Sequence, residues 1–237
     1  MYGAFGLGFQ LELSTRPEKS IGTDEQWETA THGLASALDA YGTEYALNEG
    51  DGAFYGPKID LHIKDALGRT WQCGTIQLDM SLPERFNLYY IEKDNEKHRP
   101  IMIHRTVFGS IERFLGILIE HFAGKFPLWM APVQAVILPI NDDLVPYSNE
   151  VENILKSAGL RAEVDSRTES LNKKVREAQL QYIPLILTIG GKEKEAGTLS
   201  VRTLDGNVKY GVSHQAFLDT VLAHIRNREL SLDIFSG

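Results

Sequence analysis

The chain has 237 residues, 43% of them hydrophobic, and a formal net charge of −8. These are ordinary globular values, and the length favours two modest domains over one. The net negative charge argues against a protein that coats nucleic acid generically. It is compatible with a local basic patch on one face. The single cysteine, Cys73, excludes an intramolecular disulfide and a Cys-only metal site, which fits a reducing compartment. No apolar run approaches the ~20 residues that a membrane span needs.

The first half of the chain predicts strands around one long helix. Residues 9–16 alternate apolar and polar side chains, as a strand does. Thr23 and Gln26 have the spacing of a capping box, which predicts a helix to about Ala40 with Gly42 just beyond its end. Three further strands are predicted at residues 58–64, 70–80 and 100–108, with a charged loop at 90–99. No helix separates these strands, which favours an antiparallel sheet.

Alternation also predicts the faces of these strands. Along residues 58–64, three apolar side chains share one face, and the other face carries Lys58, Asp60, His62 and Lys64. Along residues 70–80, alternation puts Trp71, Cys73 and Thr75 opposite Gln72 and Gly74, with Gln77 and Asp79 following.

Ser110 can cap a helix that runs to about Phe122, and the segment GKFPLWMAP then interrupts the pattern. We therefore expect one domain over residues 1–126 and a second over 127–237. In the second, strands at 133–140, 161–165 and 184–189 alternate with helices at 147–158 and 171–181. A hairpin around Asp205-Gly206 and a final helix after Ser213 complete it. This order predicts a small sheet with parallel pairs and helices across its faces.

Residues 104–114 (HRTVFGSIERF) are the first candidate for chemistry. Gly109 lets the backbone approach a ligand closely, and a helix N-terminus favours an anion. Arg113 in the first helical turn adds a guanidinium that can pair with phosphate or stack on a purine. Spacing alone favours a simpler interpretation over a ligand site, namely a strand, a turn and a helix that carries a surface arginine.

The loop at residues 50–58 (GDGAFYGPK) is the second candidate. Three glycines, two aromatic residues and a proline make a shaped loop, although such loops usually only turn the chain. In a functional loop, Tyr55 would hydrogen-bond a ligand and Lys58 would reach a phosphate. Gln72 and Gln77 would serve as ligand donors and acceptors if their strand lined a cleft.

These pieces occur in one order, as FYGPKID, WQCGTIQLDMSLPERF, MIHR and GSIERF. In that order they resemble the threonyl-tRNA synthetase family and, more generally, the class II aminoacyl-tRNA synthetases. GSIERF resembles the third class II signature motif, a glycine-rich turn with an arginine at the start of a helix. LSTRPEKSIGTDEQWETA and FPLWMAPVQ resemble further segments of the family, so the resemblance covers essentially the whole chain.

The resemblance implies an α/β fold in two parts. Residues 1–126 would form the C-terminal part of a class II catalytic domain, an α+β structure on an antiparallel sheet. Residues 127–237 would form a small α/β anticodon-binding domain with a mixed sheet. The implied activity is that of a threonine–tRNA ligase, which activates threonine with ATP and transfers it to tRNA-Thr in the cytoplasm. The implied cofactors are ATP, Mg²⁺ and Zn²⁺, and the full enzyme would be a homodimer without membrane contact.

The resemblance also implies roles for matched positions in the catalytic part. Arg113 resembles the catalytic arginine that holds the γ-phosphate and adenine of ATP, and Lys58 resembles a catalytic contact to phosphate or substrate. Gln72 and Ser110 resemble contributors to the ATP pocket.

Threonine recognition falls to other matched positions. Tyr55 and Gln77 would border the threonine pocket. A lone histidine on an apolar strand is usually structural, but the resemblance makes His104 one of three zinc ligands. A zinc ion that takes both the amino group and the hydroxyl of threonine would reject valine, which an apolar pocket separates poorly. Cys73 does not match a zinc ligand, so we interpret it as a small core residue.

In the second domain, the resemblance implies anticodon contacts at Glu193 and Arg202, with Lys192 nearby. A carboxylate can accept from a base amino group, and an arginine can make bidentate contacts to guanine. Lys173, Lys174 and Arg176 cluster on one predicted helix, where phosphate contact and a solvated charged face are about equally good interpretations.

The first and second signature motifs of the family have no counterpart in this sequence. We therefore expect a C-terminal portion of a longer enzyme, inactive alone, so that ATP–pyrophosphate exchange with threonine stays at background. Two alternatives stay open. The chain could be a non-catalytic module that binds the tRNA anticodon stem, or one subunit of a split synthetase.

Overall fold

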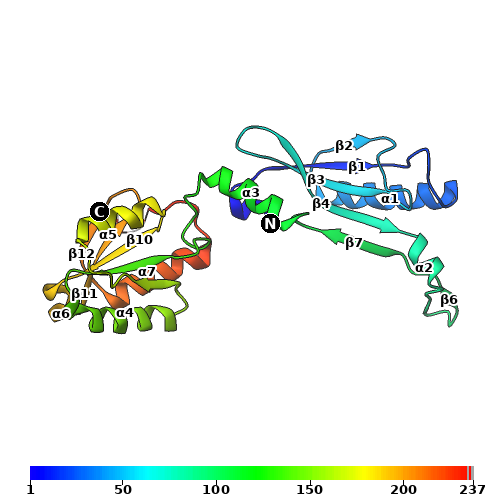
Figure 1. The fold of residues 1–237 in the computed structure, drawn as a ribbon. Helices are drawn as coiled ribbons and strands as arrows, with labels where there is room; N and C mark the ends of the chain where they lie inside the picture. The colour runs from blue at the N-terminus through cyan, green and yellow to red at the C-terminus, as the bar shows by residue number, and fades with distance from the viewer. Residues whose placement is uncertain (234, 236–237) are drawn as a thin grey trace. The chain divides into compact units, whose positions relative to one another are not determined.

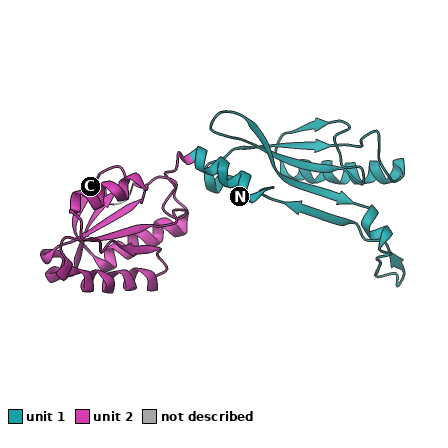
Figure 2. Cartoon of the chain, viewed as in Figure 1, with its two compact units in different colours: residues 1–121 teal, residues 122–237 magenta. Residues whose placement is uncertain are grey.

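The computed structural model describes residues 1–233 and 235. They form two compact units, Met1–His121 and Phe122–Gly237, which Figure 2 colours separately. The boundary expected after residue 126 lies a few residues beyond this division. Among the described residues, no helix combines the length and the apolarity that crossing a membrane requires.

Unit 1 is built on a five-stranded sheet of order β2-β1-β3-β4-β7, with α1 along one face (Figure 1). Leucines of α1 pack on leucines and isoleucines of β1 and β3 to form the core between helix and sheet. The elements of unit 1 are η1 (Tyr2–Phe5), β1 (Phe9–Ser14), α1 (Asp24–Tyr41), β2 (Tyr45–Asn48), β3 (Lys58–Lys64), β4 (Thr70–Asp79), α2 (Ser81–Arg85), β5 (Tyr90–Ile91), β6 (Lys97–His98), β7 (Met102–Thr106) and α3 (Ile111–Phe122).

The predicted start and end of α1 are confirmed. The Thr23 hydroxyl accepts from the Gln26 main-chain N–H, and the Gln26 side chain accepts from the Thr23 N–H, which completes the capping box. Gly42 ends the helix in the left-handed conformation, with φ of 76°. Both ends of α1 are therefore specified by local sequence.

The sheet differs from the prediction at one edge. β3 pairs antiparallel with β1 and β4, and β4 pairs antiparallel with β7, as expected. The unpredicted strand β2 pairs parallel with β1, so the sheet is mixed. Parallel neighbours need a crossover connection, and α1 supplies it.

The segment expected to be a charged loop at residues 90–99 is a small hairpin instead. β5 and β6 pair through Tyr90 with His98 and Ile91 with Lys97. Asn95 takes a φ of 64° in the turn, a conformation that asparagine tolerates better than most residues. Its tight turn gives the charged segment an ordered hairpin structure.

A bulge in β4 corrects the predicted faces of that strand. Leu61 lies opposite Gly74 and His62 lies opposite Gln72, so Cys73 is the extra residue. The Gln72 side chain therefore donates to the Thr75 hydroxyl on the same face, whereas strict alternation had put these two residues on opposite faces. Cys73 is 1% exposed, which confirms it as a core residue.

Unit 2 contains a five-stranded sheet of order β12-β11-β10-β8-β9, with helices on both faces. β8 pairs parallel with β9 and β10, as predicted, while β11 and β12 form an antiparallel hairpin around Gly206. The elements of unit 2 are β8 (Ala135–Pro139), η2 (Asp142–Leu144), α4 (Val145–Ser157), β9 (Ala162–Val164), α5 (Leu171–Leu180), β10 (Leu185–Ile189), α6 (Gly191–Ala196), β11 (Thr198–Thr203), β12 (Val208–Ser213) and α7 (His214–Asn227).

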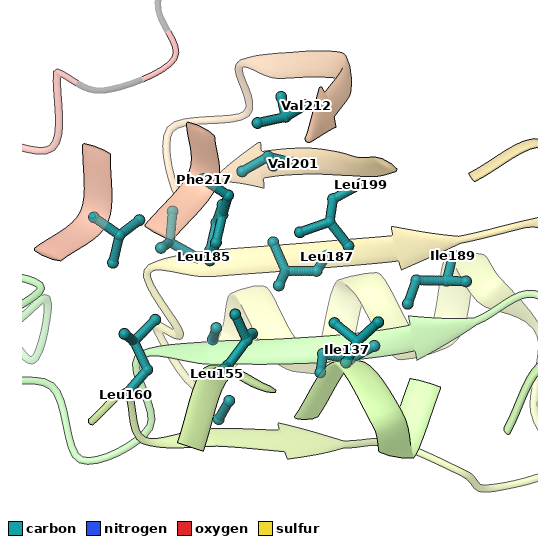
Figure 3. Packing of buried hydrophobic residues seen from close by; sticks show 14 of the residues in the cluster. Ile137, Leu155, Leu160, Leu185, Leu187, Ile189, Leu199, Val201, Val212 and Phe217 are labelled. Atoms are coloured by element: carbon teal, nitrogen blue, oxygen red, sulfur yellow. The ribbon is translucent and has the colours of Figure 1, made fainter. Parts of the chain in front are cut away.

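The core of unit 2 lies on both faces of its sheet. On one face, Leu155 of α4 and Phe217 of α7 pack on Ile137, Leu185 and Leu187, which are each fully buried (Figure 3). On the other face, Ala178 of α5 packs on the opposite side chains of β8 and β10. The sheet is thus buried on both sides, as a parallel sheet in an α/β domain usually is.

One buried carboxylate in unit 1 makes its stability depend on pH. Asp65 accepts hydrogen bonds from the Trp71 indole, the Arg69 guanidinium and the main-chain N–H groups of Leu67 and Arg69. Burial raises the pKa of this carboxyl, but these hydrogen bonds outweigh burial and lower the pKa from 3.8 to about 2.

We predict that unit 1 loses stability in acid through this group. A depressed folded pKa stabilises above the unfolded value, and this stabilisation disappears as pH falls from about 4 to about 2. Urea unfolding between pH 7 and pH 2 should show this loss. The Asp65→Asn variant should be less stable at pH 7 and show a flatter profile below pH 4. An unchanged acid profile in that variant would contradict the assignment.

Candidate active site

The face of the unit 1 sheet opposite α1 carries a row of polar side chains. Ser14 pairs with Lys58, Lys58 pairs with Gln77, and Gln77 pairs with His104. Directly opposed residues of antiparallel strands project to the same face. Three site residues expected from the sequence therefore share one row across β3, β4 and β7.

The Lys58 ammonium is held by two carboxylates. It donates to Asp60, which is 1% exposed, and to Asp51 at 3.1 Å, whose side chain is 59% exposed. Burial lowers the pKa of a lysine, but the hydrogen bonds to Asp60 and Asp51 outweigh burial and raise the pKa of Lys58 above its ordinary value. Lys58 is therefore a charged and anchored group at the floor of the polar face.

Asp60 is the most heavily bonded side chain of this face. Besides Lys58, it accepts from the Ser14 hydroxyl at 3.2 Å, the Thr75 hydroxyl at 2.8 Å and the Gln72 amide. Four donors on two oxygens satisfy a buried carboxylate. Asp60 thus fixes the positions of both Lys58 and Gln72.

The glycine-rich loop places Tyr55 over the other end of the row. Its hydroxyl donates to the Gln77 side chain at 2.9 Å, and its ring meets the His104 ring edge to face at 6.3 Å between centroids. Gly56 makes this approach feasible, because a Cβ there would lie 1.9 Å from the Leu78 carbonyl oxygen. The structure thus brings Tyr55, Gln77 and His104 together.

A second buried carboxylate orients His104. Nε2 of His104 lies 2.9 Å from Oδ2 of Asp79, a side chain that is 3% exposed. Burial raises the pKa of Asp79, but the bonds from His104 and from the Leu82 and Ser81 N–H groups outweigh burial and lower the pKa. An ionised carboxylate only accepts, so Nε2 carries the hydrogen, and in the neutral imidazole Nδ1 then keeps its lone pair for another partner.

The start of α3 adjoins the opposite end of the polar face. Ser110 caps the helix by accepting from the Arg113 N–H, as predicted. The exposed Arg113 guanidinium donates to the Gln72 carbonyl oxygen at 2.7 Å and lies 5.7 Å from the Trp71 ring centroid. Gly109 has φ of 64°, and a Cβ there would lie 3.0 Å from the Cys73 carbonyl oxygen. Gln72 thus contacts both residues: its main-chain carbonyl accepts from Arg113, and its side-chain amide donates to Asp60.

Asp60 and Asp79 are two buried carboxylates of this face that the sequence did not single out as site residues. Each lies two positions from an expected site residue on the same strand, Asp60 after Lys58 and Asp79 after Gln77. The available signal was an acidic residue at the alternate position after a candidate ligand-binding residue, Lys58 or Gln77.

In unit 2, the expected anticodon residues lie around β11. Glu193 of α6 accepts from the Gly190 N–H at 3.0 Å and from the Ser200 hydroxyl at 2.7 Å. Burial raises the pKa of Glu193, but these bonds outweigh it and lower the pKa. Arg202 lies two residues beyond Ser200 and donates to the Gly206 carbonyl oxygen at 3.2 Å, while Lys192 is exposed. The structure thus fixes Glu193 firmly and Arg202 through one bond.

The basic residues of α5 do not form one solvated face. Lys174 is 4% exposed and donates to the Asp165 carbonyl oxygen at 2.9 Å. Lys173 donates to Glu169 at 2.6 Å, and Arg176 is exposed. Lys174 therefore has a structural partner that the sequence did not reveal.

Comparison with known proteins agrees with this arrangement. Residues 1–122 match the family model of the tRNA synthetase class II core domain (G, H, P, S and T), and residues 134–224 match that of the anticodon binding domain. The chain therefore belongs to the class II aminoacyl-tRNA synthetases.

Within that class, the chain is similar to threonine–tRNA ligases. It is 71% identical to the Desulforapulum autotrophicum enzyme over 99% of this chain and 54% identical to a Clostridium botulinum enzyme over 96%. It covers 37% and 36% of these two proteins. The crystal structure of the RNA binding domain of threonyl-tRNA synthetase from Cryptosporidium parvum Iowa II superposes with a TM-score of 0.86 at 40% identity, over 98% of this chain and 58% of that one.

Proposed function

We propose that this chain is the C-terminal portion of a threonine–tRNA ligase, an enzyme that activates threonine with ATP and transfers it to tRNA-Thr. The observation that carries the proposal is the polar row of Lys58, Gln77 and His104, with Arg113 joined to it through Gln72. The similarity to threonine–tRNA ligases over nearly the whole chain supports it. We further infer a homodimer in the full enzyme and a cytoplasmic location.

Activation needs the threonine carboxylate to attack the α-phosphorus of ATP in line, with pyrophosphate leaving. No covalent intermediate on the protein is required, so catalysis consists of positioning and charge neutralisation. Arg113 would hold the γ-phosphate and stack near adenine, with Ser110 and Gln72 bordering the same pocket. Mg²⁺ would neutralise further phosphate charge.

Lys58 would contact a phosphate without leaving its buried partner. Asp60 is enclosed and bonded by four donors, whereas Asp51 is mostly exposed. A phosphate can therefore take the place of Asp51 on the ammonium while Asp60 keeps Lys58 in position. Because the ion pair with Asp60 already orients the Lys58 ammonium, this side chain loses little conformational entropy when a phosphate binds.

His104 fits one position of a zinc site. A metal-ligating histidine commonly donates its second ring nitrogen to a carboxylate, and the Asp79 contact is of that kind. Nδ1 would then be the ligand atom. When bound, zinc supplies a Lewis acid that can take the amino group and hydroxyl of threonine. Tyr55 and Gln77 would border the same substrate.

A chimeric synthetase tests the proposal. This chain replaces the matching portion of the D. autotrophicum threonine–tRNA ligase, and ATP–pyrophosphate exchange is measured with threonine, valine and no amino acid. We expect exchange that depends on threonine. A folded chimera without exchange whose isolated C-terminal chain still binds tRNA-Thr would favour a non-catalytic tRNA-binding module. Activity restored only when the N-terminal half is a separate chain would favour a split synthetase.

Unit 2 would recognise the tRNA through its anticodon, because Glu193 and Arg202 lie on neighbouring elements linked by Ser200. We expect Arg202→Ala to weaken binding of a tRNA-Thr anticodon stem-loop to the chain about tenfold or more, since a base contact by arginine contributes ~1–3 kcal/mol. Fluorescence anisotropy at fixed salt measures this. Arg226→Ala, an exposed arginine on α7, is the matched charge control. Equal losses in both variants would contradict base recognition by Arg202.

A further inference from the structure

Three side chains that commonly bind metals gather on β1 and β3. Glu12, Asp60 and His62 each offer one ligand atom, and these three atoms all lie within 4.8 Å of one another. Glu12 lies directly opposite Asp60 across the two strands. His62 is two residues beyond Asp60, so all three project to the polar face of the sheet.

His62 has a ring nitrogen that the fold leaves without a partner. Its Nε2 is enclosed and accepts or donates no hydrogen bond among the described residues. The nearest acidic oxygen, Oε1 of Glu12, is 3.7 Å away, which is too far for a hydrogen bond. A buried polar atom without a partner is uncommon in a folded protein and points to a missing ligand. Here it faces two carboxylates.

The two carboxylates are held in place by neighbours. The Asn48 amide donates to Oε1 of Glu12 at 2.8 Å, and Thr75 donates to Asp60 at 2.8 Å. Contacts of this kind orient metal ligands before an ion arrives. The Glu12 and His62 side chains are 25% and 22% exposed, so the cluster is open to solvent from their side.

The local charge favours a divalent cation. Glu12, Asp51 and Asp60 supply three negative charges, and the Lys58 ammonium bonded to Asp60 and Asp51 supplies one positive charge. With a neutral imidazole at His62, the cluster has an excess of two negative charges. An ion at Asp60 would take the place of the Ser14 hydroxyl, which at 3.2 Å is the most distant of its four donors, while Lys58 stays bonded.

We propose that Glu12, Asp60 and His62 form a binding site for a divalent first-row transition-metal ion. One imidazole nitrogen and two carboxylate oxygens suit the ions from Mn²⁺ to Zn²⁺ better than Mg²⁺ or Ca²⁺, which prefer oxygen ligands alone. Three protein ligands leave coordination positions for water. This site is separate from the expected zinc ligand His104, which lies two strands from Asp60 and His62 on the same face, one row from Asp60 and two rows from His62.

Titration of the 237-residue chain with Co²⁺ and Zn²⁺ tests the proposal. Co²⁺ is followed by its visible absorption, and Zn²⁺ by competition against bound Co²⁺. We expect one equivalent of Co²⁺ to bind and Zn²⁺ to displace it. His62→Gln and Glu12→Gln should each weaken binding about tenfold or more, since each removes a ligand. Circular dichroism checks that both variants fold.

His98 provides a matched control. It lies 2.7 Å from Asp94 and near Glu92 on the exposed β5–β6 hairpin. His98→Gln should leave the Co²⁺ affinity unchanged. Loss of binding in this control, or unchanged binding in His62→Gln and Glu12→Gln, would overturn the proposal.

A mapping experiment on the unaltered chain needs no variant to fold. Mn²⁺ broadens the NMR signals of nearby amides. We expect selective broadening of β1 around Glu12 and of β3 around His62. Broadening confined to the β5–β6 hairpin, or absent from β1 and β3, would overturn the site independently of the variants.

Discussion

The Asp60→Ala variant is expected to destabilise unit 1 by ~3–5 kcal/mol, because it leaves the Lys58 ammonium buried without its principal partner. Lys58 is 8% exposed and Asp60 is 1% exposed, so water does not replace the lost carboxylate. The change also removes the acceptor for Ser14, Thr75 and Gln72. Urea unfolding followed by circular dichroism measures the loss.

Two variants separate the buried pair from general charge effects. Asp51→Ala removes the other, mostly exposed partner of Lys58, and we expect a loss of ~1 kcal/mol or less. The double variant Lys58→Met with Asp60→Leu removes both charges, and we expect it to recover much of the stability, since apolar replacements of buried pairs are often tolerated. A midpoint for Asp60→Ala equal to that of Asp51→Ala would contradict the buried network.

Loss of Arg113 should have the largest effect on catalysis. In the chimeric synthetase, we expect Arg113→Ala to lower ATP–pyrophosphate exchange by ~10²–10³-fold, the range for removing one electrostatic contact to a reacting group. Arg113→Lys should recover only part of it, because an ammonium lacks the planar fork that pairs with phosphate and stacks on a ring. Initial rates at saturating threonine and varied ATP measure the effect.

The matched control is Arg105→Ala. Arg105 pairs with Ile76 on the opposite face of the sheet, so its loss removes the same charge away from the polar row. We expect exchange within about twofold of the unaltered chimera, since surface substitutions away from special features usually matter little. If the Arg113→Ala chimera kept as much exchange activity as the Arg105→Ala control, this would contradict the assignment of Arg113 to the ATP site.

The sequence was enough to predict those helices and strands that are determined by neighbouring residues. Thr23, Gln26 and Gly42 fix both ends of α1, and alternation fixes the faces of β3. β2 was missed because its four residues become a strand by pairing with β1, which is a tertiary contact. The faces of β4 were partly wrong because one extra residue, Cys73, shifts the register.

The candidate site was likewise predictable only in part. The order of the motifs was visible, and the expected residues of unit 1 do gather on one polar face. Their partners were only partly visible: Asp60 follows Lys58 at the alternate position of one strand, whereas the contact of Asp79 with His104 joins two strands that meet only in the fold. The roles of Arg113 and His104 rest on family resemblance, whereas their positions follow from the fold.

The carboxylate of Asp79 contacts both the His104 ring and the start of α2. Oδ1 accepts from the N–H groups of Ser81 and Leu82 at the start of that five-residue helix, while Oδ2 holds the imidazole. If α2 opens locally, the carboxylate loses its backbone anchor and the ring is released. Hydrogen exchange at Ser81 and Leu82 and rotation of the His104 ring should therefore share one opening free energy. In the proposed zinc site, the orientation of His104 would then depend on the conformational equilibrium of a surface helix.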